Sequence, residues 1–490
     1  MLLPIQISVY SPRQQRETFL FTRRIWRAVS GGAGQAKAAA RRPLSTALVP
    51  YVQGRHGGRC QPIGKPPGLT FGTIFANTCV KAPAQDGVMD ERPSRPRIGL
   101  IMSGGGARAA YQVGVLKAIA EMLPPGTPNP FAIICGASAG AINSAALAIY
   151  ARNFQQAARR LEKVWSSFHV NQVFRADARG LFVNWARWLA ALFLVGMGRG
   201  NPVALLDRAP LCRLLQRYLP CDRIQQSIDA GYLHALCIAA SGYTSGQAVS
   251  FFQAASTQMS WKRATRVGVA TKITIEHLMA SSAIPFVFEA VRLQREYFGD
   301  GSMRQMAPMS PAIHLGADRI LVIGVRPENN GQPPRAASPQ DYPSLAQIGG
   351  HVLTSIFLDA LEADLERLRR INETLRLIPA EHLTKQDRTA HLRTIGAMLI
   401  SPSRDPREIA EHHKHNFPKP VQFMLRGLGA FERGSGDLIS YLLFEKPYCQ
   451  ELIALGYADT LQRREELLAF LGQESARDLP GLDLRSGSIS

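Results

Sequence analysis

From residue 97 onwards, short apolar runs alternate with segments whose apolar residues recur every three or four positions. The runs 98–102 and 131–135 are typical of buried strands, and each is followed by a loop of small residues. Helical spacing follows each loop, over 113–123 and over 139–150. The repeated order of strand, loop and helix predicts an α/β fold with a mainly parallel central sheet flanked by helices.

Three more apolar runs extend this predicted sheet. They cover 233–240, 247–252 and 320–325. The stretch from Gly242 to Gly246 lies between the first two runs and predicts a hairpin-like turn. The third run has the continuous apolar character of a strand that is buried on both faces.

The sequence divides into parts by composition. Residues 97–326 form the predicted α/β domain, and a linker rich in Pro and Asn is expected over 327–343. A mainly helical C-terminal extension is expected over 344–471, followed by a Ser- and Gly-rich tail over 472–490. One long helix is expected in this extension, with one face marked by Leu358, Leu361, Leu365, Leu368, Ile371 and Leu375.

The beginning of the chain is strongly basic. Residues 1–97 contain 15 Lys and Arg against 4 Asp and Glu. The net charge of this segment is therefore +11, more than half of the net charge of +20 of the whole chain. No helical or strand pattern persists there, so we expect 1–96 to be a basic, disordered segment. An Arg-rich start with few acids also fits an organelle transit peptide. Met89, which directly precedes a polar lead-in to the first strand, is an alternative native start.

Composition and charge exclude several classes of protein. With 46% apolar and 19% charged residues, the chain is neither wholly disordered nor a polytopic membrane protein. Its seven cysteines show no Cys-x-x-Cys spacing, which indicates a reducing compartment and argues against a zinc ribbon. The His-rich stretch 411–415 is interpreted as a solvated helix face, so no metal is expected. No nucleic-acid partner is expected, because no recognisable reader fold follows the basic segment.

The strongest chemical motif is Gly136-Ala137-Ser138-Ala139-Gly140, which fits the G-x-S-x-G nucleophile elbow. A predicted strand ends just before it and a predicted helix begins within it, which is the context that this motif requires. The flanking residues are all small, so strand and helix can approach closely around a strained serine. The helix N-terminus would offer free N–H groups to developing negative charge. The alternative is a small-residue turn that only packs a helix on a sheet.

The earlier loop, Gly104-Gly105-Gly106-Ala107-Arg108-Ala109, has two interpretations. It fits a dinucleotide-binding loop, but that interpretation requires an acidic residue at the end of the next strand, where none is found. It also fits an oxyanion loop, in which glycines let backbone N–H groups approach an acyl oxygen. We prefer the oxyanion loop because it accounts for both loops together.

A nucleophilic serine requires a base, and two residues are candidates. His314 follows Ser138 in the order of a Ser-acid-His triad, but it lies in a predicted helix just before strand 320–325. Asp300 closes an apolar strand between Gly299 and Gly301, which would expose it on a tight turn. A partly desolvated carboxylate there could take the hydroxyl proton directly. The alternative for Asp300 is an ordinary Asp-Gly turn.

Together these motifs resemble the patatin-like phospholipase family over about 97–326. The matching motifs are Ser103 to Arg108, Gly136 to Gly140 and Asp300-Gly301, supported by 280–285 and 315–318. The helical region 343–470 resembles the extension of bacterial members. The resemblance implies an acyl hydrolase that uses a Ser/Asp dyad in place of a triad.

The resemblance assigns a role to individual residues of this chain. It implies that Ser138 is the nucleophile, that Asp300 is the base, and that the amides of Gly105 and Gly106, in the loop that begins at Gly104, form the oxyanion hole. Arg108 would order this loop or face a lipid headgroup. The chain departs from the family's pattern at Ala109, where the family usually has Gly, and at Ser302, where it usually has Gly or Ala. Both replacements are small, so we expect the geometry to survive.

An apolar stretch at 181–198 is a candidate membrane contact. Its uninterrupted part, from Trp188 to Gly198, is shorter than the roughly 20 residues of a membrane-spanning helix. Trp185, Trp188 and flanking arginines suit a helix at a lipid interface or a lid over the substrate site. A buried core helix is the alternative. We expect docking on a membrane surface through this stretch.

The sequence therefore predicts a lipid acyl hydrolase, a serine carboxylic-ester hydrolase that works without a metal or organic cofactor. Its expected substrate is a phospholipid or another acyl ester, cleaved through an acyl-enzyme. Two alternatives stay open: an acyltransferase that uses the same site, and a catalytically silent membrane-binding protein. We expect a cytoplasmic or peripheral membrane location, or an organelle if 1–88 is a transit peptide.

Overall fold

The central feature of the computed structural model is one mixed sheet, to which ten strands of the described chain belong. All described residues lie within one unit of the chain, Met89–Ser490. The predicted segments 1–96 and 181–198 lie outside the described residues except for Pro96 and Val183, and the same holds for most of 327–343 and 472–490. The structure describes residues 96–180, 183, 204–255, 258, 260–328, 343–357, 359–378, 393–432 and 435–472.

The strand order is β10-β9-β1-β2-β3-β4-β6-β5, and β8 branches from β3 and pairs with β7. The five neighbouring strands from β10 to β3 are parallel to one another. Antiparallel pairing begins where β3 meets β4 and β8. The strands are β1 (Ile98–Met102), β2 (Ile133–Gly136), β3 (Ala235–Gly242), β4 (Ala248–Ala254), β5 (Trp261–Lys262), β6 (Arg266–Ala270), β7 (Val291–Leu293), β8 (Glu296–Asp300), β9 (Arg319–Ile323) and β10 (Gly396–Ile400).

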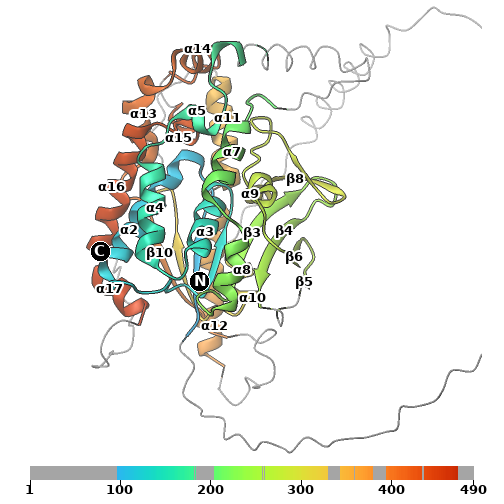
Figure 1. Cartoon of the computed structure of the whole chain (residues 1–490), viewed down its shortest axis with the longest axis vertical. Helices are drawn as coiled ribbons and strands as arrows, with labels where there is room; N and C mark the ends of the chain where they lie inside the picture. The colour runs from blue at the N-terminus through green and yellow to red at the C-terminus, as the bar shows by residue number, and fades with distance from the viewer. Residues whose placement is uncertain are drawn as a thin grey trace, which may run out of the picture. The chain divides into compact units, whose positions relative to one another are not determined.

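Helices cover both faces of the sheet. Successive side chains of a strand point to opposite faces, so Leu100 and Met102 of β1 enter one core while Ile101 enters the other. The larger core lies under α2 (Ala110–Met122), α3 (Ala139–Ile149), α4 (Phe154–Trp165) and α16 (Lys446–Gln462), and the smaller one lies under α10 (Ser310–His314) and α12 (Asp359–Arg376). Figure 1 shows α2, α4 and α16 along one flank of the sheet. This arrangement confirms the predicted fold class.

The remaining described helices connect these layers or cover their ends. They are η1 (Gly106–Ala109), α5 (Val170–Val173), α7 (Ala209–Tyr218), α8 (Asp222–Asp229), α9 (Ile275–Ser281), η3 (Gly301–Arg304), α11 (Leu345–Phe357), α13 (Pro406–His413), η5 (Lys414–Asn416), α14 (Lys419–Gly427), α15 (Gly436–Leu442) and α17 (Arg464–Phe470). In the described part of the chain, none of the helices has the length and apolar character needed to cross a membrane.

The predicted long C-terminal helix is α12. Leu361, Leu365, Leu368 and Leu375 are buried on it, but Ile371 is 38% exposed. At about 100° per residue, Ile371 lies well to one side of the stripe that the four leucines form. Ile371 thus lies at the exposed edge of this face, and Leu358 lies outside the described residues.

The C-terminal region is mainly helical, and it also supplies a strand that its helical pattern did not indicate. β10 pairs in parallel with β9 at the edge of the sheet. In addition, α16 lies directly on α2: a Cβ at Gly114 would come 2.0 Å from the carbonyl oxygen of Ile453, and a Cβ at Gly456 would come 2.2 Å from that of Tyr111. The two regions of the chain therefore share one core.

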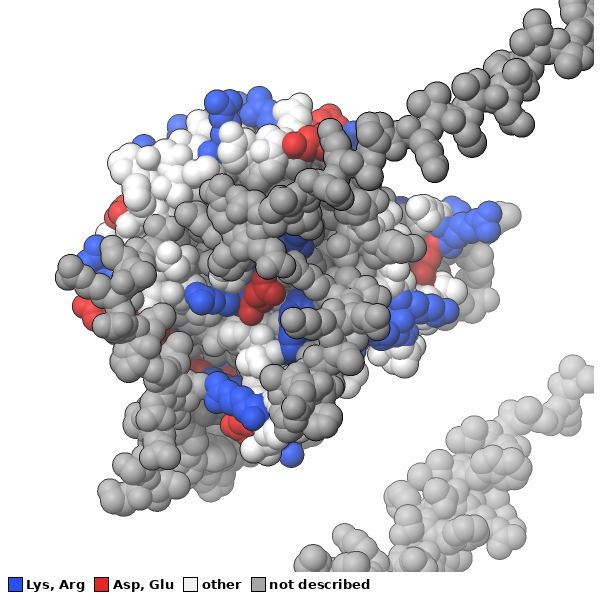
Figure 2. Space-filling view, turned by 90° about the horizontal axis from the view of Figure 1, so that it is seen from below, with Lys and Arg blue, Asp and Glu red and all other residues white. Residues whose placement is uncertain are grey.

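Among the described residues on the face shown in Figure 2, the basic side chains form no single continuous patch. Lys and Arg side chains lie scattered there, with Asp and Glu side chains among them.

Candidate active site

Ser138 occupies a tight turn between a strand and a helix. β2 ends at Gly136, and α3 begins directly after Ser138. Ser138 has φ 52° and ψ −128°, a conformation that residues other than glycine rarely adopt. The neighbours must be small, because a Cβ at Gly140 would lie 2.3 Å from the carbonyl oxygen of Met102. The local sequence thus holds the serine at the carboxyl end of β2.

The glycine loop 104–106 follows β1, the parallel neighbour of β2, so both loops lie at the same edge of the sheet. Gly106 has φ 56°, and a Cβ there would lie 2.2 Å from the carbonyl oxygen of Tyr441. The amides of Gly105 and Gly106 donate to no acceptor within the described part of the chain. These two N–H groups are therefore available to an oxygen atom of a ligand.

Asp300 ends β8 and is fully buried. β8 pairs with β3, and β3 pairs with β2, which brings the aspartate close to Ser138. Its Oδ1 accepts a hydrogen bond of 2.9 Å from the amide of Ser302. Its Oδ2 is buried without a well-aligned partner among the described residues, and the Ser138 side chain lies close enough to favour the charged carboxylate.

Burial raises the pKa of Asp300 from 3.8 to about 7. The nearby Ser138 side chain, the hydrogen bond from Ser302 and the positive charge of Arg208 act in the opposite direction, but the loss of water outweighs them. A carboxyl group with a pKa near 7 is partly ionised at neutral pH. It is therefore suited to accept and return a proton.

The segment 280–285 contacts both candidate catalytic residues, Ser138 and Asp300. The backbone amide of Ser138 donates to Ser281 Oγ at 3.0 Å. The amide of Asp300 donates to the carbonyl oxygen of Ala283 at 2.9 Å. Sequence reasoning noted this segment only through the family resemblance, because its role depends on contacts between residues far apart in the chain.

Arg208 is a residue of the site that sequence reasoning missed. Its guanidinium is buried and donates to the carbonyl oxygens of Met279 and Glu289. Burial lowers the pKa of Arg208 to about 10, and the negative charges of Glu289 and Asp300 favour its charged form. No motif surrounds Arg208 in the sequence, so only the fold reveals that it lies near the carboxylate.

Arg108 lies in the interior of the protein, with 1% of its side chain exposed. Its Nε donates to Ser440 Oγ and its guanidinium pairs with Asp437, both at 2.9 Å. The guanidinium also lies 4.2 Å from the centre of the Tyr441 ring. Of the two roles expected for Arg108, this geometry favours ordering the glycine loop, which it ties to α15.

His314 lies at the other end of the sheet from Ser138. It ends α10, just before β9 begins, whereas Ser138 follows the carboxyl end of β2. Its ring packs edge-on against Trp261, and burial with the nearby charges of Arg263 and Arg266 lowers its pKa to about 4. His314 is therefore not placed to act as a base for Ser138.

Comparison with known proteins gives one family match. Residues 100–313 match the family described as patatin-like phospholipase. This region is a patatin-like phospholipase domain. This match supports a lipid hydrolase activity. A search of curated proteins gave no match.

Solved structures give weaker similarities. The chain is similar to VipD from Legionella pneumophila, with 13% identity, 73% of this chain and 67% of that chain covered, and a TM-score of 0.25. It is also similar to the ExoU–SpcU complex of the type III secretion system of Pseudomonas aeruginosa, with 15% identity, 76% and 77% covered, and a TM-score of 0.23.

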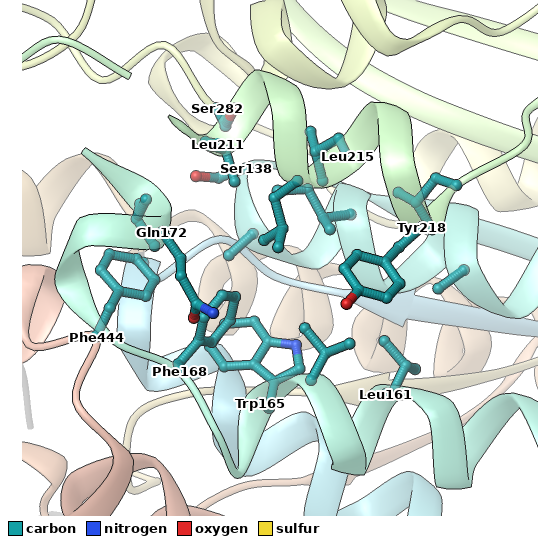
Figure 3. Close-up of a pocket in the computed structure, with 18 of the residues that line it drawn as sticks. Ser138, Leu161, Trp165, Phe168, Gln172, Leu211, Leu215, Tyr218, Ser282 and Phe444 are labelled. Carbon is teal, nitrogen blue, oxygen red and sulfur yellow. The ribbon is translucent and has the colours of Figure 1, made fainter. Parts of the chain in front are cut away.

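An apolar groove of about 300 Å³ opens beside Ser138. Figure 3 shows Ser138 and Leu211 at one end of it and Tyr218 at the other. Its walls come from α3, α4 and α7, and Phe168, Phe288 and Phe444 also line it. An apolar chain of a ligand would be removed from water in such a groove, which is energetically favourable.

The structure brings most of the predicted site residues together. Gly301 approaches the backbone of β3 so closely that a Cβ would lie 2.2 Å from the carbonyl oxygen of Ala239. Ser302 contacts the Asp300 carboxylate through its amide. In the predicted His-rich stretch, His413 pairs with Glu451 at 2.8 Å. Within the described residues, no group of three or more His, Cys, Asp or Glu side chains is arranged to hold a metal ion.

Proposed function

We propose that the patatin-like domain is a serine acyl hydrolase that cleaves fatty-acyl esters of lipids. One observation carries this proposal: Ser138, in its strained turn, faces the buried carboxyl group of Asp300 at the end of an apolar groove. The pKa of Asp300, near 7, supports a role as general base. The groove supports a substrate with a long apolar chain.

In the first half of the proposed reaction, Ser138 Oγ attacks the ester carbonyl carbon while Asp300 accepts the hydroxyl proton. Negative charge then develops on the carbonyl oxygen, and the amides of Gly105 and Gly106 donate to it. When the tetrahedral intermediate collapses, the bond to the alcohol breaks and Asp300 returns the proton to the leaving oxygen. An acyl group remains on Ser138, and the alcohol departs.

In the second half, a water molecule takes the place of the alcohol. Asp300 accepts a proton from this water as its oxygen attacks the acyl carbon. The same amides hold the second oxyanion, and collapse breaks the bond to Ser138, which regains the proton from Asp300. The products are a fatty acid and the free enzyme, so no cofactor takes part in the cycle.

The test is hydrolysis of a short-chain chromogenic ester and of a phospholipid by the full chain. Ser138→Ala and Asp300→Asn are expected to lower kcat by at least about 1,000-fold while the far-UV spectrum stays unchanged. His314→Ala serves as the matched control for the base and is expected to retain activity. Full activity of Asp300→Asn together with loss of activity in His314→Ala would overturn the choice of base.

A lysolipid acceptor added to the same assay separates hydrolysis from acyl transfer. We expect free fatty acid as the main product, because Asp300 is placed to activate water as well as serine. A transferred acyl group as the main product would make the protein an acyltransferase with the same first half-reaction. Liposome binding without any ester turnover would point to a catalytically silent membrane-binding protein.

A further inference from the structure

The groove beside Ser138 follows one face of α3 over its full length. Ile142, Ala146 and Tyr150 line it at intervals of four residues, which places them in one stripe. With a rise of about 1.5 Å per residue, Ala146 lies about 12 Å and Tyr150 about 18 Å along the helix from Ser138. The groove is therefore long as well as apolar.

The facing wall is α7, which runs in the same direction. Figure 3 shows Leu211 near Ser138, Leu215 further along, and Tyr218 at the far end. Leu211 and Leu215 are buried. Leu161 of α4 closes the side of the groove near Tyr218.

The character of the lining changes at the far end. The Tyr150 hydroxyl donates to the carbonyl oxygen of Tyr218 at 3.5 Å, and it accepts from Arg160 at 3.5 Å. The Arg160 guanidinium lies 4.6 Å from the centre of the Tyr150 ring. Arg160 is exposed, and Tyr218 is 45% exposed. We call Tyr150, Arg160 and Tyr218 the distal cluster, which brings polar groups and exposed side chains to this end of the groove.

We propose that the groove binds the acyl chain of the substrate and that the distal cluster limits the length of acyl chain that the groove accepts. This inference rests on the proposed hydrolase function. A fully extended zigzag chain advances about 1.2 Å per bond, as an extended polypeptide shows with about 3.6 Å for three bonds. The distance to Tyr150 then matches an acyl chain of about 14 to 16 carbons.

The distal cluster sets this length because a methylene group gains nothing by lying against polar groups or in water. Each methylene that enters the apolar part should raise kcat/KM by about fourfold. Beyond the distal cluster the gain should stop. The chain-length profile of the enzyme should therefore rise and then level off at about 14 to 16 carbons.

The test is a series of p-nitrophenyl esters, from four to eighteen carbons, presented to the full chain in the same detergent micelles. Ala146→Phe narrows the groove about two thirds of the way from Ser138 to Tyr150. The ratio of kcat/KM for the fourteen-carbon ester to that for the eight-carbon ester should therefore fall at least about tenfold. Tyr150→Leu removes the Tyr150 hydroxyl from the distal cluster. The ratio of kcat/KM for the eighteen-carbon ester to that for the fourteen-carbon ester should therefore rise at least about fourfold.

Tyr457→Leu is the matched control. Tyr457 lies on α16 outside the groove, and its hydroxyl donates to Glu121 at 2.6 Å. Both ratios should stay at the wild-type values in this variant. Wild-type profiles in Ala146→Phe and Tyr150→Leu would overturn the inference, and Tyr150→Leu decides alone if Ala146→Phe does not fold. A wild-type enzyme that cleaves none of the esters would contradict the proposed hydrolase instead.

Discussion

At the scale of single residues, two opposed effects determine the pKa of Asp300. Burial removes the water that would stabilise its charge, whereas Ser138, Ser302 and Arg208 favour the charged form. The balance leaves a pKa of about 7. A fully solvated aspartate would be ionised at neutral pH but would be a weak base, so burial makes the carboxylate more useful to Ser138.

The pH dependence of kcat/KM follows from this pKa. The base must be ionised, so kcat/KM should rise about tenfold per pH unit below pH 7 and level off above it. The measurement is ester hydrolysis from pH 5 to pH 9, corrected for spontaneous hydrolysis. A profile that is flat from pH 5 to pH 7 would show that Asp300 is not the base or that its pKa is not raised.

The same shift predicts that Asp300 destabilises the fold at neutral pH. Its pKa is higher in the folded state, so the unfolded chain ionises first as the pH rises above 3.8. Stability is thus lost between pH 3.8 and about 7, and it stays lost at higher pH. Asp300→Asn should raise the free energy of unfolding by up to about 4 kcal/mol at pH 8, and by about 2 kcal/mol at pH 5.

Urea unfolding at the two pH values measures this difference. Asp229→Asn is the matched control, because Asp229 is exposed and its replacement should change the free energy of unfolding by less than about 0.5 kcal/mol. If Asp300→Asn were no more stable than the wild type at pH 8, this would contradict the inference that burial destabilises the charged carboxylate.

At the scale of elements, the glycine loop after β1 depends on α15, a helix more than three hundred residues away in the sequence. Gly106 lies against the backbone of Tyr441, and Arg108 bonds to Ser440 and Asp437. The C-terminal region is therefore part of the candidate site. It holds the loop whose amides we assign to the oxyanion.

Gly106→Ala should remove activity for a steric reason. The residue has φ 56°, and its Cβ would come 2.2 Å from the carbonyl oxygen of Tyr441. We expect a loss of at least about 100-fold in kcat, comparable to the loss of an oxyanion donor. Gly126→Ala is the matched control: Gly126 has φ 76°, but nothing lies within 4 Å of its Cβ position. Equal kcat values for the two variants would contradict the assigned role of the loop.

Arg108→Lys should displace the same loop, because it weakens the contacts that tie the loop to α15. Lysine keeps the charge but loses the planar fork that reaches Ser440 and Asp437 together. We expect kcat to fall about tenfold with KM nearly unchanged, because the loop is displaced while the groove is intact. Adding Asp437→Asn should then have less effect than it has alone. Arg404→Lys, at an exposed pair with Glu451, should leave kcat unchanged.

The elements show what the sequence could and could not predict. Ser138 was identifiable as a candidate because the nucleophile-elbow motif has small flanking residues, and Asp300 because it follows an apolar strand and precedes a glycine. Arg208 and Ser281 gave no such signal, because each acts through a contact that the fold alone creates. The strand β10 was missed because only its pairing with β9 distinguishes it from the helices around it.

At the scale of the whole molecule, the patatin-like domain and the C-terminal region form one unit. β10 extends the sheet, and α16 packs on α2 with glycines at the contact. Figure 1 shows the C-terminal helices α13, α16 and α17 along the flank that α2 and α4 cover. Neither region has a complete core without the other, so they should unfold together.

Gly456→Val tests this shared core. A side chain at Gly456 meets the carbonyl oxygen of Tyr111, so we expect the free energy of unfolding to fall by about 1–3 kcal/mol while unfolding stays one transition. Gly349→Val is the control, because nothing lies within 4 Å of the Cβ position of Gly349. Circular dichroism and tryptophan fluorescence should give the same midpoint. A second transition confined to either region would contradict the shared core.

The central claim is that Ser138 is the nucleophile and that Asp300 activates it. The most direct measurement is covalent labelling with a fluorophosphonate, in which the serine oxygen bonds to phosphorus and fluoride leaves. Peptide mass spectrometry should find one adduct, on Ser138, at a rate that Asp300→Asn lowers at least about 100-fold and His314→Ala leaves unchanged. Labelling of another residue, or equal labelling rates in Asp300→Asn and the wild type, would contradict the account.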